Sequence, residues 1–488
     1  MAAPLRPLMR WALTPDYDAT STGRRVRGWE PGNAAVNALL VGSGDELRAK
    51  SRDAVRRNPW AKNAVDSYVA NAIGSGIVPQ SKHPDPKVRS TITNLWQRWT
   101  DESDADGITD FYGQQTLACR ESIEGGECLA RLRPRRMADG LTVPLQIQLL
   151  EAEHLPTWKN EDRPGGFTIR GGIEFNGIGK RVAYWLYPKH PFEILNTVNM
   201  ADPSRVPAEG VLHLYQPLRA GQHRGQPWLT VALPHLYDLQ KYDEAENLRK
   251  QLAAMMAFFI EDQNPESPLF PGDGEADEDG VPTQGLEPGS VITLPTGKTV
   301  KISEPADVGG MYSQYMAIQM RKIAACLGVT YEQLTGDLTG VNYSSIRAGL
   351  LEFRRRVEQF QHQVMVYQFC RPIWKAWIEA AVLAGELNAL DYSRRPEAYL
   401  SVEWRPQAWP WVDPLKDIEA QVLAIDNLLT SRTAVIRETG YDAEAVDAEI
   451  AADQEREKQA GLERRGTARA PQAEDAGPKP VKRNGNAA

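Results

Sequence analysis

The feature that most constrains the fold of this chain is a long segment that lacks helix breakers. Residues 235–262 contain neither proline nor glycine, and apolar side chains recur there at steps of three and four. This spacing puts the apolar side chains on one face of a helix, so we predict a long helix over 229–262. A similar pattern over 344–383 predicts a still longer helix packed lengthwise against other helices, with a kink at Pro372, which has no backbone N–H. The apolar positions are Leu236, Leu239, Tyr242, Ala245, Leu248, Leu252, Met255 and Phe259 in the first helix, and Leu350, Phe353, Val357, Phe360, Val364, Tyr367, Cys370, Trp374 and Trp377 in the second.

The composition is that of a large folded protein. Of 488 residues, 42% are hydrophobic and 25% are charged, which excludes a single small module and wholesale disorder. The net charge of −8 provides no basic field for tight, non-specific binding to duplex DNA. The longest apolar run, 252–260, is far shorter than the roughly 20 residues that span a bilayer, so we expect no membrane partner and synthesis in the cytoplasm. The four widely spaced cysteines are typical of a reducing compartment.

Changes of pattern divide the chain into segments. Residues 41–228 combine helical periods with strands of period two, at 127–133, 145–150, 173–175, 182–187 and 211–215, and predict an α+β body. The expected order is an extended arm over 1–40, this body, the helix over 229–262, a small insertion over 263–309, a helix over 310–328 ending at Gly328, a polar loop over 329–343, the long helix and a strand at 399–404 within 344–412, helices over 413–450, and a disordered tail over 451–488.

Motifs that would indicate catalysis are missing from the sequence. We find no phosphate-binding loop, no nucleophile elbow and no paired histidines with metal-ligand spacing, so we expect no enzyme activity, no cofactor and no metal. Glu151, Glu153 and His154 are the best acid/base candidates, and carboxylate pairs with many tryptophans leave a glycan-processing enzyme as an alternative. A structural role for these residues, and core packing for the scattered tryptophans, are the simpler interpretations.

Long stretches of the sequence resemble the portal proteins of tailed bacteriophages, in particular the lambda-like group. The resemblance covers about 40–440 and includes SRDAVRRNPWAKNAVDSYVANAIGSGIVPQ (51–80), DFYGQQTLACRESIEGGECLARLR (110–133), LQIQLLEAEHLP (145–156), GIEFN (172–176) and VLHLYQPLRAGQHRGQPWL (211–229). Its most specific part is RKIAACLGVTYEQLTGDLTGVNYSSIRAGLLEF (321–353).

The resemblance implies a homo-oligomeric ring, typically of twelve copies, at one vertex of the capsid in the virion. Double-stranded DNA would pass through it during packaging and ejection, driven by a separate terminase. The implied partners are the terminase large subunit, the major capsid and scaffold proteins, and a head–tail adaptor. Another head–tail connector or adaptor protein remains the alternative within this class.

The resemblance also implies an α+β portal fold and gives each segment a name. The body would be the wing, the two helices at 229–262 and 310–328 the stem, 263–309 the clip, 329–343 the tunnel loop and 413–450 the crown. A conduit needs weak, interchangeable phosphate contacts, so a few cations should face the DNA, although stem charges could instead pair between subunits. The candidates for the channel are Lys241, Arg249, Lys250, Arg321, Lys322, Asn342, Tyr343, Ser344, Ser345 and Arg347, and those for partner docking on a clip hairpin at 291–302 are Val291, Leu294, Lys298, Val300 and Ile302.

Overall fold

The computed structural model describes residues 32–193, 202–254, 258–262, 298–302, 312–340, 343–409 and 414–462. The chain divides into two compact units, one of 1–73 and 95–390 and the other of 74–94 and 391–488. Much of the predicted N-terminal arm, most of the predicted clip and the end of the predicted tail lie outside the described residues.

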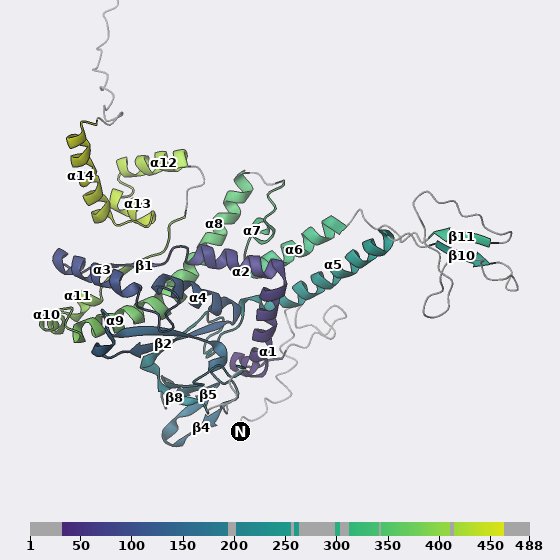
Figure 1. The fold of residues 1–488 in the computed structure, drawn as a ribbon, viewed down its shortest axis with the longest axis horizontal. Coiled ribbons are helices and arrows are strands. Elements are labelled where there is room, and N and C mark those ends of the chain that lie inside the picture. The colour runs from purple at the N-terminus through teal and green to yellow at the C-terminus, as the bar shows by residue number, and fades with distance from the viewer. Residues whose placement is uncertain are drawn as a thin grey trace, which may run out of the picture. The chain divides into compact units, whose positions relative to one another are not determined.

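The first unit begins with two helices, α1 (Val36–Arg57) and α2 (Pro59–Ala72), which meet at Asn58 (Figure 1). The Asn58 side chain accepts hydrogen bonds from the backbone N–H groups of Trp60 (3.0 Å) and Ala61 (3.2 Å), and Pro59 takes the first helical position. An Asn cap followed by proline is a strong start signal for a helix, and it explains the break in the helical pattern at this point. α1 begins earlier than predicted, inside the segment expected to be an extended arm.

Two antiparallel sheets form the β part of the body. The first has the order β3–β2–β9, and in the second β4 to β8 follow one another. A core with Leu129, Leu155, Ile173, Phe175 and Tyr184 joins residues of both sheets. The structure therefore has the predicted α+β class, with strand bounds close to those expected. The strands are β2 (Glu127–Pro134), β3 (Leu145–Glu151), β4 (Glu161–Asp162), β5 (Thr168–Arg170), β6 (Ile173–Phe175), β7 (Arg181–Leu186), β8 (Ser204–Pro207) and β9 (Val211–Tyr215).

An aromatic cluster packs helices against this body. Trp96 and Trp99 lie on α3 (Pro86–Thr100), Phe111 begins α4 (Phe111–Glu124), and Trp374 and Trp377 lie on α9 (Arg371–Leu383). The Trp96 ring centroid is 4.9 Å from that of Trp99 and 5.1 Å from that of Trp374. The indole of Trp99 donates to the backbone carbonyl of Leu145 at 2.8 Å, so its polar atom is satisfied in the core. These tryptophans pack the core, as the sequence suggested.

The predicted first stem helix is shorter than the apolar pattern implied. α5 (Leu233–Ala254) ends before Phe258, and Phe258–Asp262 forms strand β10 instead of helix. β10 pairs antiparallel with β11 (Lys298–Ile302), so β11 is not paired as the predicted hairpin at 291–302 required. The reason is that Phe-Phe-Ile favours a strand as much as a helix, and a short apolar run cannot decide between them. The second helix, α6 (Tyr312–Leu327), ends at Gly328 with a φ of +68°, as predicted.

The long helix predicted over 344–383 is interrupted by a π-helical stretch. α8 (Tyr343–Phe360) continues into η8 (Gln361–Cys370), a π-helix, and then into α9. The backbone N–H of Arg371 donates to the carbonyl of Val366, five residues back, immediately before Pro372. The backbone thus adapts ahead of Pro372, and the wider turn leaves Tyr367 65% exposed while Val366 is buried. Tyr367 was predicted to be buried because an α-helical period was assumed throughout.

Two glutamines of η8 connect it to the body. The Gln368 side chain accepts the N–H of Tyr215 at 2.9 Å and donates to the carbonyl of the same residue at 3.0 Å. It therefore binds the free edge of β9 much as a neighbouring strand would. Gln361 donates to the carbonyl of Ala72 at the end of α2, at 2.8 Å.

The second unit holds a small sheet and several helices. β1 (Val78–Ser81) pairs antiparallel with β12 (Val402–Arg405). Tyr399 was predicted to start this strand but is buried in the preceding helix α11 (Pro396–Leu400). The predicted tail is helical up to Ala460, because Asp442 caps α14 (Ala443–Ala460) and alanine and glutamate favour helix. The remaining helices are α7 (Tyr331–Thr335) in the first unit, α10 (Ala389–Arg394) at the division, and α12 (Pro414–Asp426) and α13 (Arg432–Glu438) in the second. Among the described residues, no helix has the length and apolar character to cross a membrane.

Candidate functional site

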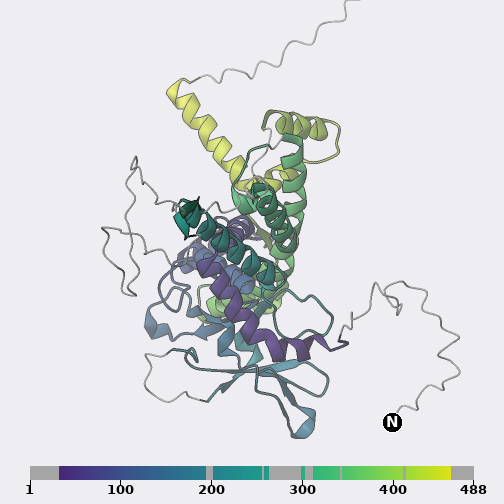
Figure 2. The same cartoon turned by 90° about the vertical axis from the view of Figure 1, so that its right-hand side faces the viewer.

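The predicted stem is a pair of helices joined by tyrosines. α5 and α6 run side by side, and α1 lies beside the root of α5 (Figures 1 and 2). The ring of Tyr242 on α5 is 4.5 Å from that of Tyr315 and 6.1 Å from that of Tyr312 on α6. The hydroxyl of Tyr312 donates to the carboxylate of Asp243, and this hydrogen bond raises the pKa of Tyr312 to about 12. The two helices are therefore fixed to each other near their outer ends.

The three predicted channel cations on α5 differ in how strongly they are paired. Lys241 is exposed, with its ammonium 4.4 Å from the centre of the Tyr237 ring. Arg249 pairs with Glu246 at 2.6 Å, and Lys250 lies 3.8 Å from the same carboxylate and 4.6 Å from the Tyr312 ring centre. Glu246 is only 8% exposed, so Arg249 and Lys250 are partly neutralised within the subunit.

The remaining channel candidates lie on α6 and α8. Arg321 is exposed and stacks 5.1 Å from the Tyr331 ring centre, and the Lys322 ammonium is 3.3 Å from the Gln319 side chain. Tyr343 and Ser344 form the first turn of α8, followed by the exposed Ser345 and the half-buried Arg347. Asn342 lies outside the described residues. The structure brings Arg321 next to α7, which is fixed by a reciprocal cap between Thr330 and Gln333.

The docking candidates are only partly described. Lys298, Val300 and Ile302 lie in β11, where they face residues of β10 across the ladder, with Val300 opposite Ile260. Val291 and Leu294 lie outside the described residues.

A fully buried carboxylate, Glu127, lies at the root of the stem. Arg224 donates to it from Nε at 2.7 Å and also from Nη2, and Arg48 of α1 donates at 3.1 Å. The backbone N–H of Gly225 (2.7 Å) and Nε2 of His213 (2.9 Å) complete its partners. Burial would raise the pKa of Glu127, but Arg224 and His213 hold it well below the usual value. Burial lowers the pKa of His213, so its neutral ring donates to the carboxylate.

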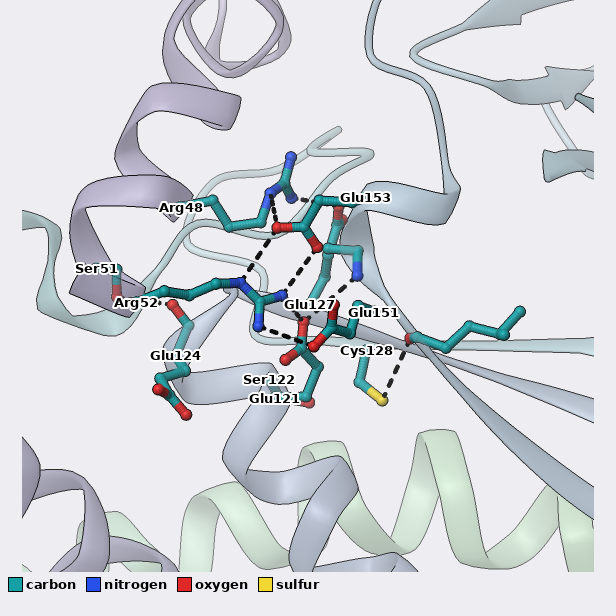
Figure 3. A network of polar contacts seen from close by, with 12 residues as sticks. Arg48, Ser51, Arg52, Glu121, Ser122, Glu124, Glu127, Cys128, Glu151 and Glu153 are labelled. Carbon is teal, nitrogen blue, oxygen red and sulfur yellow. Dashed lines mark hydrogen bonds and ion pairs between the residues drawn. The ribbon is translucent and has the colours of Figure 1, made fainter. Parts of the chain in front are cut away.

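A second group of carboxylates surrounds Arg52 on the neighbouring turn of α1 (Figure 3). Its guanidinium pairs with Glu121 at 2.7 Å, Glu153 at 2.8 Å and Glu151 at 3.2 Å. Burial, with a further contribution from Glu153 and Glu151, raises the pKa of Glu121 to about 8 despite the proximity of Arg52. Arg52 is therefore shared by more negative charge than it can neutralise.

Glu151, Glu153 and His190 lie close enough together to suggest a metal site. The backbone N–H of Phe192 donates to Nδ1 of His190 at 3.2 Å, so the neutral ring carries its proton on Nε2 and donates it to Glu151 at 3.0 Å. That nitrogen has no lone pair to offer a metal. The same two carboxylates are held by Arg52, and His154 is tied to the carbonyl of Glu151 at 3.2 Å. This arrangement favours a structural role for Glu151, Glu153 and His154 over acid/base catalysis.

The comparison with protein families decides which class this arrangement belongs to. The model of the family described as phage portal protein, lambda family, matches residues 22–361, which is more than half of the chain. This chain belongs to the lambda family of phage portal proteins.

Curated relatives of this portal protein are similar over most of its length. It is 28% identical over 466 residues to the probable portal protein of Halomonas phage phiHAP-1, covering 92% of this chain and 88% of that protein. It is 21% identical over 492 residues to portal protein B of Escherichia phage lambda, covering 90% and 89%.

Solved structures resemble the portal protein more distantly. A chain in the virion of the native gene transfer agent particle aligns over 82% of this chain and 93% of its own length, with a TM-score of 0.47 and 14% identity. The portal protein of the HK97 family from Corynebacterium diphtheriae aligns over 61% and 82%, with a TM-score of 0.33 and 12% identity.

Sequence reasoning did not predict the charge network of this portal protein. Arg48 and Arg52 were visible as charged residues of a helix, but Glu127 and Arg224 are 97 positions apart and show no motif. The only available signal was an acidic residue, Glu127, at the start of an otherwise apolar strand, a position where burial requires a partner.

We expect Glu127→Gln to destabilise the first unit by about 3 kcal/mol, because a neutral amide leaves two buried guanidinium groups without their counter-charge. The midpoint of urea unfolding measures this. Glu161→Gln, at an exposed pair on β4, is the control and should change stability by less than about 0.5 kcal/mol. Equal effects of the two substitutions would show that the Glu127 network contributes little.

We also expect stability to fall as the pH rises from 4.5 to about 8, the range over which the folded state keeps a proton on Glu121. In this range the unfolded chain has released that proton, so the folded state binds more protons and loses stability with increasing pH. Glu121→Gln should remove this part of the pH dependence, whereas Glu161→Gln should retain it. Urea unfolding at several pH values provides the measurement, and an unchanged slope in Glu121→Gln would contradict the assignment.

Proposed function

We propose that this chain is the subunit of a ring at one vertex of the capsid, through which double-stranded DNA enters during packaging and leaves at ejection. The observation that carries the proposal is the match to the lambda portal family over 22–361, a range that contains the body, α5, α6 and the start of the long helix. In this assignment the body is the wing, α5 and α6 form the stem, residues 329–343 form the tunnel loop, and the helices after 413 form the crown.

The charges of the stem suit a conduit. A strongly basic bore would bind DNA through release of counterions and oppose its movement. Here Glu246 holds Arg249 and Lys250, so Lys241, Arg321 and Lys322 are the cations best placed for weak contacts with passing phosphates. The first turns of α8, with Asn342 and Tyr343 before them in the chain, would add polar contacts at the tunnel loop.

The partners follow from the same role. The chain would act as a structural part of the virion, without catalysis of its own, assembling in the host cytoplasm with the scaffold and major capsid proteins. The terminase large subunit would dock at the clip during packaging, and a head–tail adaptor would follow. The pairing of β10 with β11 supports this, because a two-stranded sheet is marginal alone and gains stability from neighbours.

We expect the purified chain to form closed rings with an open centre, of about a dozen copies, because a head-to-tail interface closes when its rotation fits. Native mass spectrometry gives the number of subunits, and electron microscopy of the same sample shows the channel. A monomer or dimer that fails to assemble even with capsid and scaffold proteins would contradict the proposal.

We expect the double substitution Lys241→Glu and Arg321→Glu to reduce DNA packaging several-fold, because it puts negative charge in the path of the phosphates. Nuclease-protected DNA per capsid measures packaging. Lys180→Glu, in an exposed turn after β6, makes the same charge change away from the stem and should package normally. Normal packaging by the stem variant, with rings intact, would show that these side chains face neighbouring subunits instead.

A further inference from the structure

A cavity of about 620 Å³ opens beside the carboxylate group described above. One wall is aromatic: Trp158 is 63% exposed, Phe192 is 74% exposed, and the indole of Trp158 donates to the hydroxyl of Tyr187 at 3.0 Å. Two large apolar rings this exposed, around one hollow, are unusual for a surface that contacts only water. The cavity therefore has the character of a binding site, and it lies within the first unit.

The opposite wall carries an excess of negative charge. Glu121, Glu151 and Glu153 all pair with Arg52, and Arg48 is held by Asp45 at 2.7 Å and by Glu127 at 3.1 Å. Within this network five carboxylates (Asp45, Glu121, Glu127, Glu151, Glu153) face three guanidinium groups (Arg48, Arg52, Arg224). The raised pKa of Glu121 reflects the same imbalance. Aromatic rings beside surplus carboxylates form a surface that attracts a cation, with an arginine or lysine as the natural ligand.

A segment of this chain has the matching chemistry. Residues 24–29 read Arg-Arg-Val-Arg-Gly-Trp, which joins three cations to one large aromatic ring. They precede α1, whose residues Asp45, Arg48 and Arg52 line the cavity. From Trp29 to the start of α1 at Val36, an extended chain reaches about 23 Å, and Asp45 lies about 14 Å along the helix from Val36. A chain folded back along α1 can therefore reach the cavity.

We propose that residues 24–29 bind in this cavity of the same chain, with Trp29 against Trp158 and Phe192 and the arginines toward Glu151 and Glu153. This binding is independent of the proposed function, because it needs no second subunit. It would fix the segment that leads into α1 to the same carboxylates that bind Arg52.

Trypsin cleavage after Arg24, Arg25 and Arg27 tests the proposal, because a docked segment is cut only when it opens. The full chain is digested briefly, and mass spectrometry follows these three bonds. We expect the double variant Trp158→Ala and Phe192→Ala to be cut about tenfold faster than the unaltered chain, as is typical for the loss of aromatic anchors. Trp29→Ala, on the other side of the contact, should accelerate cleavage after Arg24 and Arg25 in the same way. Both wall residues are exposed, so the fold should survive, which an unchanged urea midpoint verifies.

Ile178→Ala is the matched control, since Ile178 is an 87% exposed apolar residue in the turn after β6 and lies outside the cavity lining. It should leave cleavage unchanged. Equal cleavage of the unaltered chain and the wall variant would overturn the proposal. So would protection that disappears on dilution, because that outcome assigns the segment to a neighbouring copy. Native mass spectrometry of the same samples reports ring assembly separately: protection without rings would count against the proposed function alone, and rings without protection against the docking alone.

Discussion

The buried carboxylate of Glu127 is the interaction on which the arrangement of the body depends. Its partners come from α1, from β9 and from the loop before α5, segments that are far apart in the sequence. Gly126 beside it has a φ of +88°, and a Cβ there would lie 2.4 Å from backbone atoms of Gln226 and Pro227. The start of β2 and the chain entering α5 therefore touch backbone to backbone. A charge in this position is costly unless all its partners are present, so the network specifies one relative placement of helix, sheet and stem root.

The two charged regions of the molecule solve opposite problems. Around Glu127 the charges are fully paired, which makes the joint rigid. Along α5 and α6 the pairing is partial, since Glu246 holds two cations while Lys241 and Arg321 stack on tyrosine rings and stay exposed. A surface with few, partly neutralised cations is what a passing polyanion needs. The rigid joint and the weakly charged stem thus complement each other in the proposed conduit.

Much of the fold could be predicted because local signals were strong. Asn58-Pro59 separated α1 from α2, Gly328 ended α6, and period-two patterns located most strands of the body. The errors came where two structures share one pattern or where the partner is distant. Phe258 and its neighbours fit a helix or a strand, and pairing with residues 298–302 decided the outcome. Tyr367 was misplaced because a π-helix cannot be inferred from an apolar period. The partners of Glu127 could not be found at all, since ion pairs over such separations follow from the fold alone, and the channel residues remain a prediction because they concern an assembly rather than one chain.

The amide of Gln368 has a consequence for a protein that is concentrated in many copies. It occupies both hydrogen-bonding groups of Tyr215, at the edge of the sheet that ends in β9. An open strand edge is a template for pairing with the same edge of another molecule, which leads to aggregation rather than to closed assembly. At Tyr215 a single side chain acts as a guard against this pairing. Copies crowded together during assembly are thereby directed toward other contact surfaces.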